Sequence, residues 1–354
     1  MKKKTSRAIA VLLLIFICAL PLAACENPTP AGTNGPIQPK NRLWYEYFDT
    51  ICVAYDYSGM DNAEFDGVCE LIEGELKACH ELFDIYNEYS GINNLATVNK
   101  NAGGEAVKVD SRIIELLKFS KEMYDKTGGE VNIAMGAVLV LWHNAREWAN
   151  DNPNKAHLPD MAALTAASEH TDINSIVINE ADGTVKITDP KARIDVGAIA
   201  KGFTTERIAG ILIEKNITSF VLDFGGNLRT IGEKPDGTGW NTAIRNPNPT
   251  SDNPYVRTLV LKDSSLVTSG TYERFFTVDG TRYHHIIDGE TLMPENRYTS
   301  VSIHVKSSAV ADALSTAAFN MTRAEIEELT KSMPGVEITV VANDGELSVY
   351  GEYK

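Results

Sequence analysis

The fold is decided by the stretch Ser219-Phe-Val-Leu-Asp-Phe-Gly-Gly-Asn-Leu-Arg-Thr-Ile231. Its aromatic and β-branched residues predict a strand, and Asp223-Phe-Gly-Gly-Asn227 within it predicts a β-bulge or a tight bend. A helix is expected just before it, over residues 198–216, and a block of strands just after it. The strands are predicted over residues 240–246, 257–267, 275–287 and 299–306. Strands in a block, without regular alternation with helices, predict an α+β fold of mainly antiparallel sheet with flanking helices.

Elements on both sides of this block complete one continuous domain, predicted over residues 41–354. Aromatic and β-branched residues predict a strand or hairpin arm over residues 42–57, and apolar residues at helical spacing predict a long helix over residues 61–86. The other expected elements are helices over 111–123 (capped by Asp110 or Ser111), 159–169, 312–319 and 323–332, a hairpin over 175–187, and a strand pair across Asn343-Asp344-Gly345.

The N-terminus has the three parts of a lipoprotein signal peptide. Basic residues at positions 2–4 and 7 precede an apolar run over residues 8–22, which is too short for an ordinary membrane-spanning helix. The run ends in Leu22-Ala-Ala-Cys25, a lipobox whose cysteine thiol takes the lipid. We predict a signal peptide over residues 1–24, lipid attachment at Cys25, and a location on the outer face of the cytoplasmic membrane. An ordinary secretory signal, with Cys25 incidental, is the alternative.

Composition limits the partners of the protein. Residues 25–40 contain four prolines, two glycines and almost no apolar side chains, so they predict a flexible tether behind the lipid and not a core. The formal net charge of -15 argues against nucleic acid as a partner and against docking of the domain on anionic lipid. The membrane is therefore expected to be reached through the lipid anchor.

Three cysteines remain in the predicted domain: Cys52, Cys69 and Cys79. Cys69 and Cys79 lie on one predicted helix, where a rise of about 1.5 Å per residue separates them by about 15 Å. That distance is too long for a disulfide bond, and their spacing fits no metal-binding motif. We predict three ordinary buried thiols.

Two glycine-rich motifs supply groups suited to a bound anion. In Asp195-Val-Gly-Ala-Ile-Ala-Lys-Gly202, Lys201 could reach a phosphate, and Asp195 could accept a hydrogen bond from a ribose or a ring N–H. An ordinary strand-to-helix turn with a helix-capping Asp195 is the alternative. The stretch Thr268-Ser-Gly-Thr-Tyr-Glu-Arg274 offers hydroxyls and backbone amides suited to a phosphate or to the edge of a flavin.

Two further motifs carry acid/base and metal-binding groups. In Tyr283-His-His-Ile-Ile-Asp288 the two histidines point to opposite faces of a strand, which disfavours a two-histidine zinc site. The inward histidine, with Asp288 nearby, is a usable acid/base pair, and a buried hydrogen-bonded histidine is the alternative. In Ala311-Asp-Ala-Leu-Ser-Thr316, Asp312 and Thr316 share one helix face and are oxygen ligands suited to Mg²⁺. Capping of the helix by Asp312 is the alternative.

Taken together and in this order, these motifs resemble the ApbE family of FAD:protein FMN transferases. The resemblance runs from about residue 47 to the C-terminus. It is carried by Asp195-Val-Gly-Ala-Ile-Ala-Lys-Gly202, Phe224-Gly-Gly-Asn227, Thr268-Ser-Gly-Thr-Tyr-Glu-Arg-Phe-Phe276, His285-Ile-Ile-Asp288 and Ala311-Asp-Ala-Leu-Ser-Thr316. Members of this family are often periplasmic or surface lipoproteins, which agrees with a lipid at Cys25.

The resemblance implies an enzyme that cleaves the pyrophosphate of FAD, attaches FMN to a threonine or serine hydroxyl of an acceptor protein, and releases AMP. It implies Mg²⁺ on the Ala198 carbonyl, Asp312 and Thr316, with Ser315 as a further candidate ligand. His285 would lie near the reacting phosphate, where it or a carboxylate could take the proton of the acceptor hydroxyl. The implied acceptor is an extracytoplasmic flavoprotein of a membrane electron-transfer system. The implied FAD contacts are Phe48, Tyr86, Glu130, Val131, Asn132, Asp195, Lys201 and Ile287.

The sequence departs from the family pattern at three places. The family usually reads His-Ile-Ile-Asp-Pro-x-Thr-Gly, whereas this chain continues Asp288-Gly-Glu-Thr-Leu292. Asn132 stands where the family commonly has Asp, and Asp49-Thr50 replaces the usual Gly-Thr pair near the flavin. None of the three changes removes an expected metal ligand, so we expect an active enzyme.

Three other functions are compatible with parts of the sequence. The same site could act as a Mg²⁺-dependent FAD pyrophosphatase, with water in place of the acceptor hydroxyl. A flavin-binding lipoprotein without turnover is the second alternative. The third is a solute-binding lipoprotein of a transporter, which is disfavoured because such proteins have two lobes of alternating strands and helices.

Overall fold

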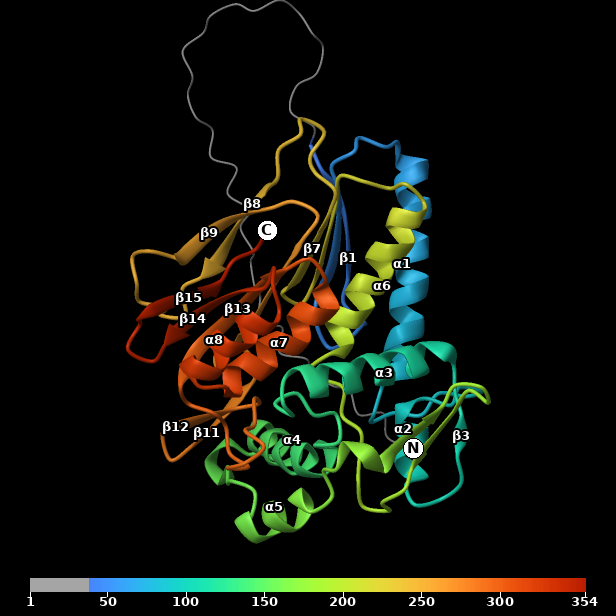
Figure 1. Cartoon of the computed structure of the whole chain (residues 1–354), viewed down its shortest axis with the longest axis vertical. Helices are drawn as coiled ribbons and strands as arrows, with labels where there is room; N and C mark the ends of the chain where they lie inside the picture. The colour runs from blue at the N-terminus through green and yellow to red at the C-terminus, as the bar shows by residue number, and fades with distance from the viewer. Residues whose placement is uncertain (1–37) are drawn as a thin grey trace, which may run out of the picture. The chain divides into compact units, whose positions relative to one another are not determined.

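The computed structural model describes residues 38–354, which belong to one compact unit. The predicted signal peptide, Cys25 and most of the predicted tether lie outside the described residues. Within residues 38–354, no helix is both long and apolar enough to cross a membrane. The fold class is the predicted one, an antiparallel sheet with helices packed beside it (Figure 1).

An eight-stranded sheet forms the centre of the fold, and its neighbouring strands are antiparallel in the order β1-β2-β6-β7-β10-β13-β14-β15. The stretch 219–231 supplies two of these strands, β6 (Phe220–Phe224) and β7 (Asn227–Ile231). Gly225 and Gly226 join them with φ values of 62° and 87°. A two-residue hairpin turn of this hand needs positive φ at both positions, so the predicted tight bend is confirmed. The other strands are β1 (Lys40–Trp44), β2 (Cys52–Asp56), β10 (Ser265–Gly270), β13 (Tyr298–Val305), β14 (Glu337–Ala342) and β15 (Leu347–Gly351).

Smaller sheets accompany the large one. β3 (Val107–Lys108), β5 (Thr184–Ile187) and β4 (Ile176–Asn179) form one, and β11 (Phe275–Val278) pairs with β12 (Thr281–His284). β8 (Trp240–Arg245) pairs with β9 (Tyr255–Leu261). The single strand predicted over 257–267 is wrong, because Asp263, at a φ of 44°, turns the chain between β9 and β10.

Two helices that pack against the large sheet also pack against each other: α6 (Ala200–Glu214) and α7 (Ser308–Asn320) (Figure 1). A Cβ atom at Gly202 would lie 2.4 Å from the Asp312 Cβ and 2.4 Å from the Ser308 carbonyl oxygen. Glycine at this position therefore permits the close approach of the two helices. α7 begins earlier than predicted, with Ser307 as its N-cap, so Asp312 lies inside the helix and does not cap it.

The other predicted helices are all present, and α2 (Leu95–Lys100) is a helix that was not predicted. Asp110 caps α3 as expected, by accepting a hydrogen bond from the Arg112 N–H. The three cysteines of the domain are free and buried, so the prediction of ordinary buried thiols is confirmed. Burial raises the pKa of Cys52 and Cys79 to about 12, which keeps these two thiols protonated. The remaining helices are α1 (Asn62–Phe83), α2 (Leu95–Lys100), α3 (Ser111–Lys126), α4 (Gly136–Asp151), α5 (Met161–Ser168) and α8 (Arg323–Ser332), with 3₁₀ turns η1 (Pro153–Lys155) and η2 (Ile173–Ser175).

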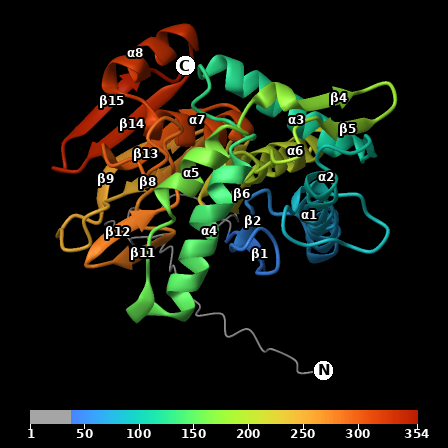
Figure 2. The same ribbon diagram turned by 90° about the horizontal axis from the view of Figure 1, so that it is seen from below.

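Helix α4 was not predicted from the sequence. Its N-cap is Met135, whose side chain makes no capping hydrogen bond, so the usual start signal is missing. Its buried residues nevertheless recur at helical spacing, at Val138, Trp142, Ala145 and Ala149. The helix packs against the β11–β12 hairpin (Figure 2).

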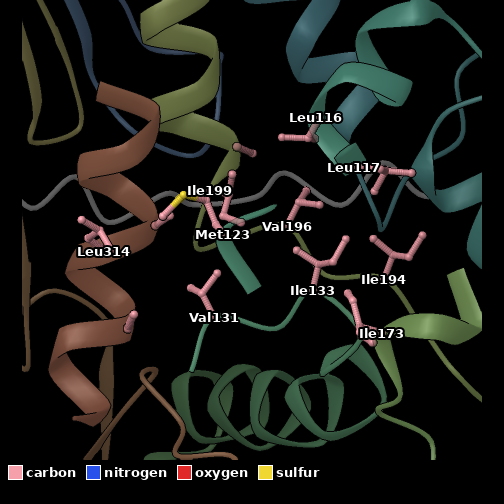
Figure 3. Packing of buried hydrophobic residues seen from close by; sticks show 14 of the residues in the cluster. Leu116, Leu117, Met123, Val131, Ile133, Ile173, Ile194, Val196, Ile199 and Leu314 are labelled. Atoms are coloured by element: carbon pink, nitrogen blue, oxygen red, sulfur yellow. The ribbon is translucent and has the colours of Figure 1, made fainter. Parts of the chain in front are cut away.

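A large apolar cluster fixes the segments that carry the candidate site. Figure 3 shows Val131 and Ile133 facing Val196 and Ile199, with Leu314 of α7 and side chains of α3 closing the cluster. Each such aliphatic side chain contributes about 1.5–3 kcal/mol when it is fully buried. The core thus brings segments 130–135, 194–200 and α7 together, although they are far apart in the sequence.

Candidate active site

The junction of α6 and α7 holds a buried carboxylate, Asp312. The Lys201 Nζ atom lies 3.3 Å from Asp312 Oδ1, and the Gly202 N–H donates to Oδ2 at 2.8 Å. The Ser315 hydroxyl donates to the Asp312 carbonyl oxygen (2.9 Å) and lies 2.8 Å from the Ser269 hydroxyl of β10. The fold thus places the Lys201 ammonium group beside Asp312. The same group could bind a phosphate instead when one is present.

The predicted Mg²⁺ ligands fit such an ion by the chemistry of their donor atoms. Asp312 offers a carboxylate, Thr316 offers a hydroxyl one helical turn later, and the Ala198 carbonyl precedes α6. These are hard oxygen donors of the kind that Mg²⁺ takes. Within residues 38–354, no group of three or more His, Cys, Asp or Glu side chains gathers as a metal site. Asp312 is 4% exposed, and Lys201 supplies the cation that a buried carboxylate needs beside it.

Asp195 lies in a turn before α6 and does not cap that helix, whose N-cap is Ile199. Asp195 Oδ1 accepts from the Gly197 N–H (2.8 Å), and the Asp195 N–H donates to the Ile133 carbonyl (2.8 Å). The strand expected before this turn is reduced to one bridge between Met135 and Arg193. Burial raises the pKa of Asp195.

Asn99 was missed by the sequence reasoning. Its buried side chain donates to the Ile194 carbonyl (2.9 Å) and accepts from the Ile194 N–H (2.7 Å). It therefore fixes the residue next to Asp195. A lone asparagine on a short helix carries no recognisable signal in a sequence.

The loop at Phe48 has a strained backbone. Phe48 and Asp49 have φ values of 55° and 51°, which suits the glycine that the family usually has at the position of Asp49. The Phe48 N–H donates to His80 Nδ1 at 3.2 Å. A Cβ atom at Gly225 would lie 2.3 Å from the Thr50 hydroxyl, so this loop contacts the β6–β7 turn.

The stretch Glu130-Val131-Asn132 leads into Ile133, whose carbonyl accepts from the Asp195 N–H, but its side chains are partly engaged elsewhere. Val131 is buried in the core. The Asn132 amide donates to the Thr171 carbonyl (2.9 Å), and its oxygen accepts from the Ala134 N–H (2.8 Å). An aspartate has no N–H to donate to the Thr171 carbonyl, which gives a physical reason for the asparagine at position 132. Burial, and then Asp288, raise the pKa of Glu130.

The two histidines point apart, as predicted. His284 is buried, with Nε2 2.7 Å from the Glu295 carbonyl oxygen. His285 is exposed, and its Nδ1 lies 3.1 Å from the Arg274 carbonyl oxygen. A carbonyl can only accept, so Nδ1 carries the proton and Nε2 is the free base.

Desolvation of the imidazole by surrounding protein atoms, and then the charge of Arg274, lower the pKa of His285 to about 3. The ring is also in contact with water. Because the pKa of His285 lies below its ordinary value, the imidazole is neutral at pH 7. A neutral imidazole with a free Nε2 can accept a proton.

The expected acid/base pair with Asp288 is not formed. Asp288 Oδ1 instead accepts from the N–H groups of Glu290 (3.0 Å) and Thr291 (2.6 Å) and shapes the following turn. In that turn Leu292, at the family's glycine position, keeps a left-handed φ of 61°. Its carbonyl accepts from Trp142 Nε1 at 3.0 Å, and its side chain is buried with Trp142 and Ile287.

The site does not coincide with a large cavity found among the described residues. That cavity, of about 680 Å³, lies near the C-terminal half of α1 and is lined by charged and polar groups such as Glu81, Tyr89 and Arg112. The residues named above lie outside it. The candidate site is therefore defined by its chemical groups and not by this cavity.

Comparison with known proteins assigns the chain to a family. A family model described as the ApbE family matches residues 50–340. The chain belongs to the ApbE family. A curated relative from Treponema pallidum, called FAD:protein FMN transferase, is 33% identical over 309 residues, which cover 83% of this chain and 82% of that protein.

Solved ApbE structures share the fold. The ApbE protein of Thermotoga maritima matches with a TM-score of 0.76 and 26% identity, over 88% of this chain and 97% of that chain. The flavin transferase ApbE from Vibrio cholerae matches with a TM-score of 0.71 over the same shares, and at 22% identity it supports the fold alone. The mixed architecture predicted from the sequence is thus the ApbE fold.

Proposed function

We propose that this chain transfers FMN from FAD to a threonine or serine hydroxyl of an acceptor protein and releases AMP. The observation that carries the proposal is the buried Asp312 carboxylate at the α6–α7 junction, held by Lys201 and one turn from Thr316. The relatives named above support the reaction class. The acceptor oxygen would form a bond to the FMN phosphorus while the bond from that phosphorus to the AMP oxygen breaks.

Asp312, Thr316 and the Ala198 carbonyl would hold Mg²⁺, with Ser315 as a further candidate ligand. A bound divalent cation neutralises charge on the pyrophosphate and stabilises the leaving AMP. Lys201, which pairs with Asp312, would add a positive charge beside the same phosphates. Gly202 keeps the Asp312 carboxylate in place through its N–H.

His285 is proposed as the base that takes the proton of the acceptor hydroxyl. Its Nδ1–H donates to the Arg274 carbonyl, and this hydrogen bond orients the ring and leaves Nε2 free. The lowered pKa of His285 keeps Nε2 unprotonated at neutral pH. General base catalysis of this kind commonly contributes ~10²–10⁴-fold to the rate.

We further propose that the domain works outside the cytoplasmic membrane, anchored by a lipid on Cys25 and separated from the bilayer by the tether of residues 25–40. This part of the proposal rests on the sequence of the N-terminus. A lipid anchor binds with about 0.8 kcal/mol per buried methylene. The acceptor would then be a flavoprotein of a membrane electron-transfer system with an outward-facing domain.

The test is a flavinylation assay with the purified protein, FAD, Mg²⁺ and an acceptor that carries an exposed threonine. Flavin fluorescence should remain with the acceptor after denaturing electrophoresis, with one AMP released per flavin attached. Asp312→Asn should lower the rate by at least about 100-fold, because it removes the only charged ligand among the three proposed. Asp344→Asn, in the turn between β14 and β15, is the matched control and should leave the rate unchanged.

Free FMN in place of labelled acceptor, with AMP release that needs no acceptor, would identify a pyrophosphatase instead. FAD binding without AMP release from any substrate would identify a flavin-binding protein. Either outcome would overturn the transferase assignment.

A further inference from the structure

His80, in the last turn of α1, lies at the centre of a cluster of aromatic rings. Its imidazole meets the rings of Tyr47, Phe48 and Tyr89 at centroid distances of 5.9, 5.6 and 6.3 Å, each at a steep angle between the ring planes. Such edge-to-face contacts are the favoured packing of aromatic rings. They restrict the plane of the half-buried imidazole, so its two nitrogens point in defined directions.

One nitrogen of His80 holds the backbone of the Phe48 loop. The Phe48 N–H donates to His80 Nδ1 at 3.2 Å, so Nδ1 carries no proton. Phe48 and Asp49 have φ values of 55° and 51°. A residue other than glycine keeps a positive φ only where its surroundings hold it there. The hydrogen bond to Nδ1 supplies such a restraint at the first of these two residues.

The other nitrogen of His80 is linked to a carboxylate. Because Nδ1 accepts, the proton of the neutral imidazole lies on Nε2, which is 3.4 Å from the Tyr89 hydroxyl oxygen. The Tyr89 hydroxyl in turn donates to Asp84 Oδ2 at 2.9 Å. Every donor therefore has an acceptor, from the Phe48 N–H at one end to the Asp84 carboxylate at the other. Hydrogen bonds that run in one direction in this way strengthen one another.

Asp84 is a firmly held end of this chain. It accepts from the Tyr86 N–H (2.7 Å) and from both the backbone N–H (3.0 Å) and the side-chain amide (2.9 Å) of Asn87. Burial alone would raise the pKa of Asp84, but the hydrogen bonds from Asn87, Tyr86 and Tyr89 lower it. Tyr86 itself is 53% exposed. The loop that carries Phe48 is thus tied to the turn that carries Tyr86.

We propose that His80 is a positioning residue for FAD, because its Nδ1 holds the Phe48 loop in the conformation that binds this substrate. The inference rests on the proposed function, in which Phe48 contacts FAD. His80 acts through the backbone of Phe48 and is given no contact with FAD of its own. It should therefore affect the binding of FAD and not the transfer step, which is proposed to take place at Asp312 and His285.

Two amide substitutions separate the roles of the two nitrogens. In His80→Asn the side-chain oxygen can take the position of Nδ1 and accept from the Phe48 N–H. In His80→Gln the amide reaches the position of Nε2, and the Phe48 N–H loses its acceptor. The loss of such a hydrogen bond predicts about tenfold weaker FAD binding by His80→Gln, whereas His80→Asn should stay within about threefold of the wild type. Calorimetric titration of the full-length protein with FAD, in EDTA so that no turnover occurs, measures both.

Steady-state kinetics provide a readout that a merely structural role would not move. In the flavinylation assay with Mg²⁺ and the threonine-bearing acceptor, His80→Gln should raise the KM for FAD by about tenfold and keep kcat within about twofold of the wild type. Tyr89→Phe keeps the ring and removes the hydroxyl that receives the Nε2 proton. It should raise the KM for FAD by only about two- to threefold, because the bond to Phe48 remains.

Lys77→Gln is the matched control. Lys77 is exposed on α1, one turn before His80, and the substitution introduces the same side chain as His80→Gln. The FAD affinity of Lys77→Gln should equal that of the wild type. Circular dichroism should show each variant folded.

The outcomes separate this inference from the proposed function. Equal weakening of FAD binding by His80→Asn and His80→Gln would overturn the inference, because the position of the acceptor would then not matter. Wild-type affinity in His80→Gln, a loss of kcat with an unchanged KM, or equal weakening by Lys77→Gln would overturn it as well. In each of these cases, FMN transfer by the wild type would leave the proposed function standing. Failure of the wild type to bind FAD would overturn both.

Discussion

The α6–α7 junction and the loop at Phe48 are built by opposite means. At the junction, two regular helices approach so closely that only glycine fits at position 202, and Asp312 is buried between fixed partners. At the loop, Phe48 and Asp49 are held in the left-handed region, and Asp49 is exposed. The proposed metal ligand Asp312 is thus positioned by rigid packing, whereas the proposed FAD contact at Phe48 is positioned by strained and partly exposed backbone.

The largest effect on the free energy of unfolding is expected from a pair of glycine substitutions on α6, which test this contrast. Gly202→Ala should lower the free energy of unfolding by ~1–3 kcal/mol, because the new Cβ would overlap Asp312 and Ser308. Gly210→Ala should raise it by up to ~1 kcal/mol, because nothing lies within 4 Å of a Cβ there and alanine favours helix. Urea unfolding measures both. Changes of the same sign would contradict a tightly packed junction.

A smaller effect is expected in the Phe48 loop. Asp49→Gly should raise the free energy of unfolding by about 0.5 kcal/mol, because glycine adopts a φ of 51° without strain. Asp49→Val should lower it by roughly 1 kcal/mol, since a β-branched residue tolerates positive φ poorly. Thermal unfolding of the two variants provides the measurement. If both variants match the wild type, the loop is not held in this conformation in solution.

The smallest effect concerns the pH dependence of stability through His285. The pKa of His285 is lowered in the folded protein, so below its ordinary value near 6.5 the unfolded chain binds a proton that the folded chain does not. His285 therefore lowers stability as the pH falls from about 6.5 toward 3. Because the ring is exposed, we expect only a few tenths of a kcal/mol between pH 7 and pH 5.

Comparison with His285→Gln isolates this contribution. The variant should lose less stability than the wild type between pH 7 and pH 5 in urea unfolding. A larger loss in the variant would mean that the folded ring binds its proton more tightly than the unfolded one, and the proposed neutral base would then be wrong. His284→Gln is a useful companion, because burial lowers the pKa of His284 in the same direction.

Several elements could be predicted because their signals are local. The capped start of α3 at Asp110 and the strands around Gly225-Gly226 each depend on residues within one turn or one strand. The opposite directions of His284 and His285 follow from the two-residue period of a strand. Other predictions failed where a local signal was weak, as at the uncapped start of α4 and at the turn formed by Asp263.

By itself, the sequence determined the α+β class, the order of the main elements and the motifs that identify the family, because periodicity, turn residues and short motifs are properties of neighbouring residues. The tertiary structure alone decided that Lys201 and Gly202 meet Asp312 and that Asp288 shapes a turn and does not pair with a histidine. It also decided that His80 of α1 accepts from the Phe48 N–H. These contacts join residues far apart in the chain, and their distances depend on how the core packs, which no local pattern specifies.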